Sequence, residues 1–418
     1  MNTLLKTLMF VILACVQLNC NSKAQNRVIE ETNPTAIGIT EAFSPWQEGY
    51  LDIHHINTGN GDCSFMVFPD GTTMLFDAGI IDKGKFEEKY APLKATSTVP
   101  SDSLSAAAWI ANYIKRMASE DSKAQIDYAL VSHFHSDHYG SLPDLARMVP
   151  VRKIIDRNYP DLNFPFDLRK KLAEDEFFQN YLSLISNKKI AAEALDVGSD
   201  SQIYLVNDKR SYPNFKVRNV KSNATIWTGH NNETIEFFKA TEMTDFYKGG
   251  YNENPLSLAL KISYGKFDYF TGGDNTGLQG FGLPYWFDVE TPMAKGVGKV
   301  EVVTLNHHSN RDATNEFFVR TLDPKVVVQQ SWCSDHPGQE VYQRLIYKDD
   351  KMEERDIFAT NMHPETLVTY GPWFKDNYKS MRGHIVIRVN PGGEKYKVFI
   401  LNEATMQITQ EYGPYSSK

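Results

Sequence analysis

The sequence predicts a layered α/β fold with its chemistry gathered at one edge of a sheet. Three observations support this prediction. Short runs of strand-like residues separated by turn residues, between 51 and 76, are typical of neighbouring antiparallel strands. An amphipathic pattern at about 104–117 precedes an apolar strand at 126–132, which leads directly into a histidine-rich segment at 131–140. Later strands also end in polar residues, as they do in α/β folds that build a site at one sheet edge.

The first part of the folded region is expected to begin at Tyr50 and to hold three strands, a helix and a fourth strand. Ser101, Asp102 and Ser103 are residue types that cap helix starts, and they precede the helix expected at 104–117. A short helix is expected at 142–148. The strands are expected at 51–56, 63–68, 74–76 and 126–132, with a tight loop at 58–62 and a turn at 69–71.

Residues 151 to about 250 have a weaker pattern and are interpreted as an elaboration beside the active site. This region is expected to hold a charged helix at 167–188 and strands at 202–206, 215–220 and 224–227. After about residue 250 the strand pattern of the sequence is clear again. Strands are expected at 256–263, 267–271, 300–305 and 325–330, and C-terminal strands at about 383–402.

The segment from Val131 to Gly140 contains four metal-binding side chains in the spacing H-x-H-x-D-H. In an extended chain, side chains two residues apart point to the same side, so His133 and His135 can bind one cation together. Asp137 and His138 follow where the backbone turns, which predicts that they bind a second cation nearby. Three nitrogen donors and one carboxylate suit zinc or a similar metal, and two such ions hold a hydroxide at neutral pH.

The first 24 residues predict an export signal, because a short apolar core at 8–16 follows Lys6 and is too short to span a membrane. A lipoprotein-type site at Cys15 would leave a very short core, so lipid attachment at Cys20 and cleavage after Ala24 are the alternatives. Residues 25–45 are expected to form a linker and residues 46–418 the folded domain. The protein is therefore expected in the periplasm or on the outer cell surface, either free or lipid-anchored.

Cleavage at Cys20 or after Ala24 leaves two cysteines, Cys63 and Cys333, in the folded part. Both are expected in loops near the metal ligands. An exported protein can join such a pair in a disulfide, and two buried thiols are the alternative.

The formal net charge of -8 over 418 residues argues against a long basic groove for duplex nucleic acid. A metal site can nevertheless bind phosphate groups without such a groove. The length allows two ordinary domains or one enlarged domain with a large core. The expected substrate partner is a small molecule or a short nucleotide.

Five segments, in this order, carry a resemblance to known proteins. They are TGNGDCSFMVFPDGTTMLFDAG at 58–79, VSHFHSDHYGSL at 131–142, NENPLSLALKISYGKFDYFTGGD at 252–274, VEVVTLNHHSN at 300–310 and DHP at 335–337. Together they resemble the metallo-β-lactamase fold superfamily and, more narrowly, the hydrolase domain of ComEC-type competence proteins and its stand-alone relatives. The resemblance implies an αββα sandwich with a metal site at one edge and an inserted segment beside it.

The resemblance also implies the roles of individual residues. His133 and His135 would bind metal one, Asp137 and His138 would bind metal two, and Asp274 would bridge both. His307 would complete a shell, with the adjacent His308 as the competing choice. Asp77 is expected either to orient a ligand histidine or to cap a turn.

Two departures from the superfamily pattern concern the metal ligands. The superfamily commonly supplies another histidine between the first motif and the bridging aspartate, where this chain has only His230 in dissimilar surroundings. Ser309 and Asn310 replace the glycine and serine of the usual HHGS segment. One metal is therefore expected to be held less tightly than the other.

These expectations lead to an exported hydrolase with two zinc ions, manganese being the alternative metal. Asp137 is expected to orient the hydroxide or to carry a proton, and His336 either to contact the substrate or to be a structural loop histidine. The narrower resemblance implies a phosphodiester substrate, and the wider one an ester, lactone or β-lactam. A non-catalytic binding protein and redox chemistry on a di-iron site are the alternatives from other classes.

Overall fold

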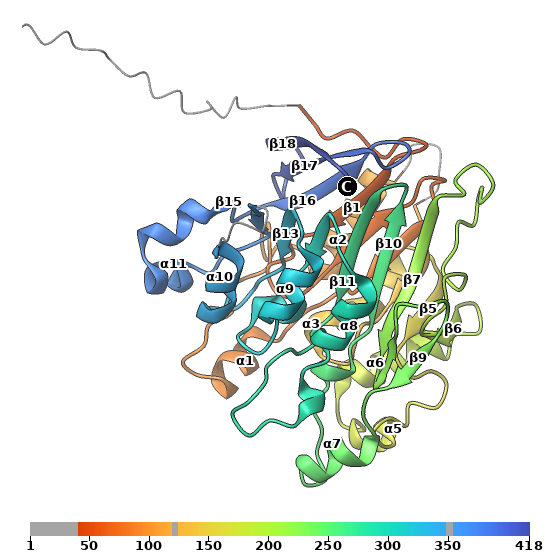
Figure 1. The fold of residues 1–418 in the computed structure, drawn as a ribbon, viewed down its shortest axis with the longest axis vertical. Helices are drawn as coiled ribbons and strands as arrows, with labels where there is room; N and C mark the ends of the chain where they lie inside the picture. The colour runs from red at the N-terminus through yellow and green to blue at the C-terminus, as the bar shows by residue number, and fades with distance from the viewer. Residues whose placement is uncertain (1–40, 119–123, 348–353) are drawn as a thin grey trace, which may run out of the picture. The chain divides into compact units, whose positions relative to one another are not determined.

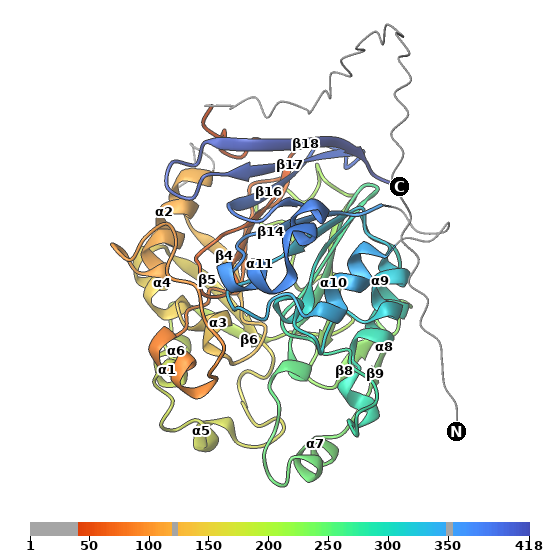
Figure 2. The same cartoon turned by 90° about the vertical axis from the view of Figure 1, so that its left-hand side faces the viewer.

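Two mixed sheets stacked face to face, with helices on both outer sides, organise the chain (Figure 1). The computed structural model describes residues 41–118, 124–347 and 354–418. The expected export signal, the Cys20 lipid site and most of the expected linker lie outside these residues. Figure 2 shows α2, α4 and α6 on one side of the paired sheets and α8, α9 and α10 on the other. The predicted αββα fold class is confirmed.

The first sheet has nine strands in the order β18-β17-β16-β1-β2-β3-β4-β5-β6. Pairing is antiparallel from β18 to β3 and parallel from β3 to β6. The parallel half carries the histidine motif at the end of β4. The strands are β1 (Leu51–His55), β2 (Ser64–Val67), β3 (Thr73–Phe76), β4 (Ile126–Leu130), β5 (Val151–Asp156), β6 (Ala191–Ala194), β16 (His384–Val389), β17 (Lys395–Leu401) and β18 (Ile408–Ser416).

The second sheet also has nine strands, in the order β15-β14-β13-β12-β11-β10-β7-β8-β9. Pairing is parallel from β11 to β15 and antiparallel across the remaining strands. The strands are β7 (Phe215–Ser222), β8 (Thr225–Trp227), β9 (Thr234–Glu236), β10 (Ala259–Tyr264), β11 (Phe267–Gly272), β12 (Val302–Thr304), β13 (Val326–Gln329), β14 (Asp356–Ala359) and β15 (Tyr378–Ser380).

Helices cover the outer face of each sheet. Leucine, isoleucine and valine side chains from both sheets form one core between the layers, and a further core lies under the helices on each side. No helix in the described ranges is long and apolar enough to cross a membrane. The helices are α1 (Lys83–Lys89), α2 (Ala106–Met117), α3 (Ser136–Tyr139), α4 (Leu142–Met148), α5 (Leu168–Lys171), α6 (Glu176–Ile185), α7 (Ala240–Phe246), α8 (Glu290–Val297), α9 (Glu316–Leu322), α10 (Gln339–Ile346) and α11 (Pro364–Tyr370), with short 3-10 turns η1 (Asn254–Leu256), η2 (Tyr285–Phe287), η3 (Asn306–Ser309) and η4 (Pro372–Asn377).

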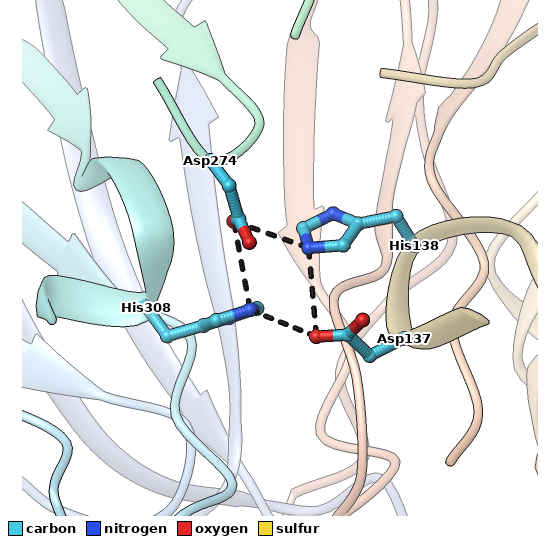
Figure 3. A group of neighbouring side chains, drawn as sticks. All are labelled: Asp137, His138, Asp274 and His308. Carbon is cyan, nitrogen blue, oxygen red and sulfur yellow. Dashed lines mark hydrogen bonds and ion pairs between the residues drawn. The ribbon is translucent and has the colours of Figure 1, made fainter. Parts of the chain in front are cut away.

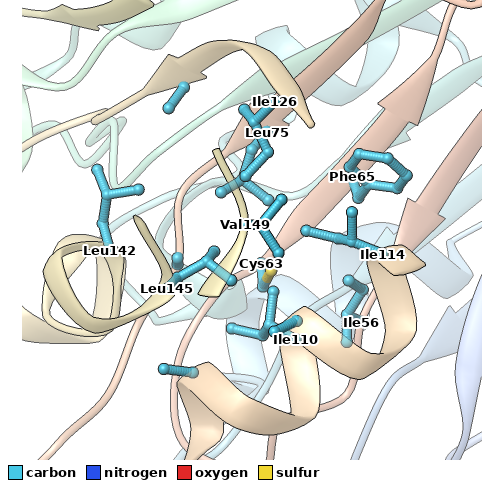
Figure 4. Packing of buried hydrophobic residues seen from close by; sticks show 14 of the residues in the cluster. Ile56, Cys63, Phe65, Leu75, Ile110, Ile114, Ile126, Leu142, Leu145 and Val149 are labelled. Carbon is cyan, nitrogen blue, oxygen red and sulfur yellow. The ribbon is translucent and has the colours of Figure 1, made fainter. Parts of the chain in front are cut away.

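Helix α2 shows how the outer layer is attached to the first sheet. Its apolar residues recur every three or four positions, so one face of the helix is continuously apolar. Figure 4 shows Ile110 and Ile114 on this face, packed toward Phe65 and Leu75 of the sheet. Each fully buried side chain of this size contributes about 1.5–3 kcal/mol to stability.

Several local predictions differ from the structure. Helix α2 begins two residues later than predicted, because Ser105 accepts a hydrogen bond from the Ala108 N–H and caps it. The helix predicted at 167–188 is two helices, since Asp175 caps a new start at α6. Residues 202–206 form no strand, and β18 was not predicted. Of the expected linker, residues 41–45 are described, and Phe43 packs edge-on against Phe399.

Candidate metal centre

The histidine motif occupies the corner between β4 and α3, and glycines on two neighbouring loops let those loops pack against it. A Cβ at Gly79 would lie 1.7 Å from the Asp137 carbonyl oxygen, and one at Gly61, where φ is 153°, would lie 2.6 Å from the same atom. The Asp62 N–H donates to that carbonyl at 2.9 Å. Only glycine permits backbones to approach this closely, so both loops hold the motif in place.

Four of the predicted ligands form one cluster: Asp137, His138, Asp274 and His308 (Figure 3). The Nε2 atom of His138 lies 3.1 Å from Asp274 Oδ1 and 3.6 Å from Asp137 Oδ2. The Nε2 atom of His308 lies 3.0 Å from Asp137 Oδ2 and 3.5 Å from Asp274 Oδ1. A tetrahedral ion with bonds of about 2.0–2.2 Å requires ligand atoms roughly 3.3–3.6 Å apart, so these donors fit zinc closely.

Two ligand atoms of this cluster are buried without a hydrogen-bond partner, as expected of atoms that bind a cation. Neither His138 Nε2 nor Asp274 Oδ1 makes a hydrogen bond, although both are buried. Burial by itself lowers the pKa of His138, but the carboxylates of Asp274 and Asp137 outweigh it and raise that pKa well above its usual value. Burial raises the pKa of Asp274, yet His138 and His308 together hold it well below its usual value. A cation must displace protons from these histidines, so its affinity should increase with pH.

A second group contains His133, His135 and the same Asp274. His133 Nε2 lies 3.7 Å from Asp274 Oδ2 and 3.0 Å from His135 Nδ1. Asp274 therefore presents Oδ1 to the first cluster and Oδ2 to the second. This is the placement that a bridging carboxylate between two ions requires.

Carboxylates pair with the Nδ1 atoms of two ligand histidines, His138 and His308, whose Nε2 atoms face the cluster. Asp77 Oδ2 lies 2.9 Å from His138 Nδ1, and Asp77 Oδ1 accepts the Ser132 N–H at 2.7 Å. Asp62 Oδ1 lies 2.9 Å from His308 Nδ1. A proton on Nδ1 that is donated to a carboxylate leaves Nε2 free to bind a metal. The sequence interpretation gave no role to Asp62, although an aspartate at the end of a glycine-rich loop was a usable signal.

The adjacent histidines lie on a left-handed turn at η3. The φ angles are 48° at His307, 51° at His308 and 71° at Ser309, a conformation that costs non-glycine residues about 1–2 kcal/mol each. The buried Glu290 carboxylate holds this turn from both sides, accepting hydrogen bonds from Asn306 Nδ2 and from backbone N–H groups that follow the turn, all at 2.7 Å. Burial raises the pKa of Glu290 to about 7.

The remaining predicted residues lie around these clusters. His336 is in neither group; its ring stacks on His308 with centroids 5.0 Å apart, and burial lowers its pKa to about 3. His230 is exposed in the turn between β8 and β9 and belongs to none of the candidate groups in the described residues. Cys63 and Cys333 are both free and buried, so the structure has the two-thiol alternative and not the disulfide.

Residues 56–202 match the family model described as "Metallo-beta-lactamase superfamily". The matched segment contains the complete H-x-H-x-D-H motif and its Asp62 and Asp77 supports. This segment is therefore similar to the metallo-β-lactamase superfamily, whose members are mostly metal-dependent hydrolases. No curated protein matches the chain.

Three solved structures are among those similar to this chain. A variant of CmlA beta-hydroxylase is 13% identical with a TM-score of 0.37, and the match covers 83% of this chain but 55% of the CmlA chain. A putative metal-dependent hydrolase from Parabacteroides distasonis is 14% identical with a TM-score of 0.36, covering 77% and 98% of the two chains. The metallo-beta-lactamase SMB-1 bound to 2-mercaptoethanesulfonate is 12% identical with a TM-score of 0.30, covering 64% and 83%.

Proposed function

We propose that this protein is an exported hydrolase that uses two zinc ions, or manganese in their place, to cleave phosphodiester bonds in a small molecule or short nucleotide. The observation that carries the proposal is the sharing of Asp274 between two donor groups at one sheet edge. Bound there, the ions would supply a hydroxide at neutral pH and polarise the bond to be cleaved.

The charges at the centre favour an anionic substrate. The ligand set contains two carboxylates, Asp137 and Asp274, with neutral imidazoles as its other donors. The two carboxylates among the ligands do not neutralise two divalent ions, so an open position on either ion can bind a phosphate oxygen, while the carboxylates of Asp77, Asp62 and Asp312 lie behind the histidine rings, away from that position. Direct binding of phosphate oxygens by the ions does not require the basic groove that a net charge of -8 argues against.

Two residues of the chain have roles in the proposed reaction. The side chain of Asp137 is 12% exposed, so this carboxylate reaches water as well as the ligand cluster and can orient the attacking water or accept its proton. His336 is neutral in its buried position, so it offers a hydrogen bond to the leaving group and not an imidazolium proton. Both roles require the His308 ring to keep its position, because it lies beside the Asp137 carboxylate and stacks on His336.

The test is metal content by elemental analysis, measured with hydrolysis of a bis-aryl phosphodiester, a lactone and a chromogenic β-lactam. About two equivalents of zinc or manganese and phosphodiester turnover support the proposal. Turnover of only the lactone or β-lactam overturns the substrate class and leaves a hydrolase of the wider superfamily. Bound iron with redox activity, or no metal with no turnover, overturns the hydrolase altogether.

A pair of histidine variants provides the matched control. His135→Ala removes a donor of the second group and should abolish turnover and lower metal content with the fold intact. His230→Ala changes an exposed histidine outside the candidate groups and should leave both unchanged. Full turnover in His135→Ala would rule out the proposed mechanism.

Export is a separate part of the proposal and rests on the first 24 residues of the sequence. Fractionation of cells expressing the full chain tests it. Recovery in the periplasm or at the outer surface supports export. Release from the membrane fraction by Cys20→Ala supports the lipid anchor, and retention of the whole chain in the cytoplasm refutes both.

A further inference from the structure

Two neighbouring histidines of one turn approach the centre from different directions. His307 Nε2 lies 3.7 Å from Asp274 Oδ2, and His308 Nε2 lies 3.5 Å from Asp274 Oδ1. Each oxygen of this carboxylate belongs to a different donor group, since Oδ2 faces His133 and Oδ1 faces His138. The left-handed turn thus directs consecutive side chains at opposite sides of the bridging residue.

His307 is also prepared as a ligand in the same way as His308. The Nδ1 atom of His307 pairs with the Asp312 carboxylate, as Nδ1 of His308 pairs with Asp62. This pairing fixes the ring and directs Nε2 toward the centre. The partner of His307 Nε2 is the side-chain nitrogen of Asn254 at 3.0 Å. Because Asn254 is neutral, it competes weakly with a divalent cation for that nitrogen.

The two groups differ in their number of metal-binding atoms, and this difference shows what His307 would add. The group around Asp137 has four ligand atoms, whereas the group of His133 and His135 has three. Zinc in protein sites usually takes four ligands, or three with an open position for water. His230, the candidate for a further ligand by sequence, is exposed in a distant part of the second sheet. His307 is not a member of the smaller group as it stands, but its Nε2 lies 3.7 Å from the shared oxygen Asp274 Oδ2, so its ring has to move toward His133 and His135 to bind the same ion.

We propose that the adjacent histidines serve different ions. His307 completes the group of His133, His135 and Asp274 Oδ2, and His308 completes the group of Asp137, His138 and Asp274 Oδ1. One short turn thereby supplies a ligand to each ion. This inference rests on the two-ion centre of the proposed function.

The test compares His307→Ala with His308→Ala in the zinc-loaded full chain. Elemental analysis gives the number of ions, and anomalous scattering from crystals at the zinc edge shows which position is lost. In His307→Ala the ion beside His133 and His135 should be lost and the ion beside Asp137 kept. In His308→Ala the pattern should be reversed. Retention of both ions in His307→Ala, or loss of the ion beside Asp137, overturns the inference.

Milder variants keep the test decisive if an alanine variant does not fold. Asp312→Asn removes the partner of His307 and should weaken zinc about 10–100-fold at the His133 site alone, while Asp62→Asn should do so at the Asp137 site alone. Equal weakening of both sites by Asp312→Asn refutes the assignment. A wild-type protein with fewer than two ions also overturns it, whereas two ions and turnover in the wild type leave the proposed function standing whatever His307→Ala shows.

Discussion

A buried ion pair behind the histidine motif yields a prediction that can be worked through in detail. Arg157 follows β5 directly, and its Nε and Nη2 donate to the two oxygens of Glu253 at 2.6 and 2.9 Å. Both side chains are almost fully buried, at 0% and 2% exposed. The same Glu253 accepts the Phe134 N–H at 2.9 Å, between the two histidines of the first group. The pair therefore holds the backbone that carries His133 and His135.

Arg157→Leu would leave the Glu253 carboxylate buried without its charged partner. Breaking a buried pair in this way costs about 3–5 kcal/mol, because the remaining charge keeps its desolvation penalty. An unfolding entropy of roughly 2.1 cal/mol/K per residue over the roughly 370 residues that the structure describes converts this loss into a decrease in Tm of about 4–6 °C. Metal content should fall as well, since Glu253, which accepts the Phe134 N–H, loses the partner that holds it in position.

The assay is thermal unfolding of the metal-free and zinc-loaded protein, with Arg152→Leu as the control. Arg152 lies on β5 and pairs with Asp127 at 3.3 Å, but its side chain is 60% exposed. Asp127 is buried, but its carboxylate also accepts hydrogen bonds from Thr73 and Gln125, so loss of the exposed Arg152 should cost much less than loss of Arg157. The double variant Arg157→Leu/Glu253→Leu should recover part of the loss, since no unpaired charge remains. A Tm decrease in Arg157→Leu no larger than that in Arg152→Leu would refute the reasoning.

Three further predictions concern single groups. Asp77→Asn removes the carboxylate partner of His138 Nδ1 and should weaken zinc binding about 10–100-fold in equilibrium competition with a chelator; unchanged affinity would mean that Asp77 only caps a turn. Burial lowers the pKa of His384 to about 4, below an unfolded value near 6.5, so the stability it contributes is present above pH 6.5 and is lost as pH falls toward 4. His384→Gln should flatten the acid side of the stability–pH curve, and an unaltered slope would contradict this. Because Cys63 and Cys333 are free thiols, the Tm should be the same under reducing and oxidising conditions, and a higher Tm on oxidation would show that a disulfide forms.

Much of the fold was predictable because it depends on local patterns. The alternation near residues 51–76 gave three antiparallel strands, and α4 was predicted at its observed bounds, Leu142–Met148. The helix predicted at 167–188 was wrong because Asp175 offers a side-chain cap that restarts the helix, a local competition that apolar periodicity does not reveal. Strand β18 was missed because its sequence, ITQEYGPYS, has few apolar residues and contains a glycine and a proline, which are uncommon inside strands.

The sequence by itself determined which donor types meet in the first motif, since His133, His135, Asp137 and His138 fall within one short segment that runs from the end of β4 into α3. The tertiary structure decided the rest of the centre. It paired Asp62 with His308, 246 residues away in sequence, and it directed His307 and His308 at different oxygens of Asp274. Local propensity acts over a few residues, whereas these contacts exist only after two sheets have packed and brought distant loops to one edge.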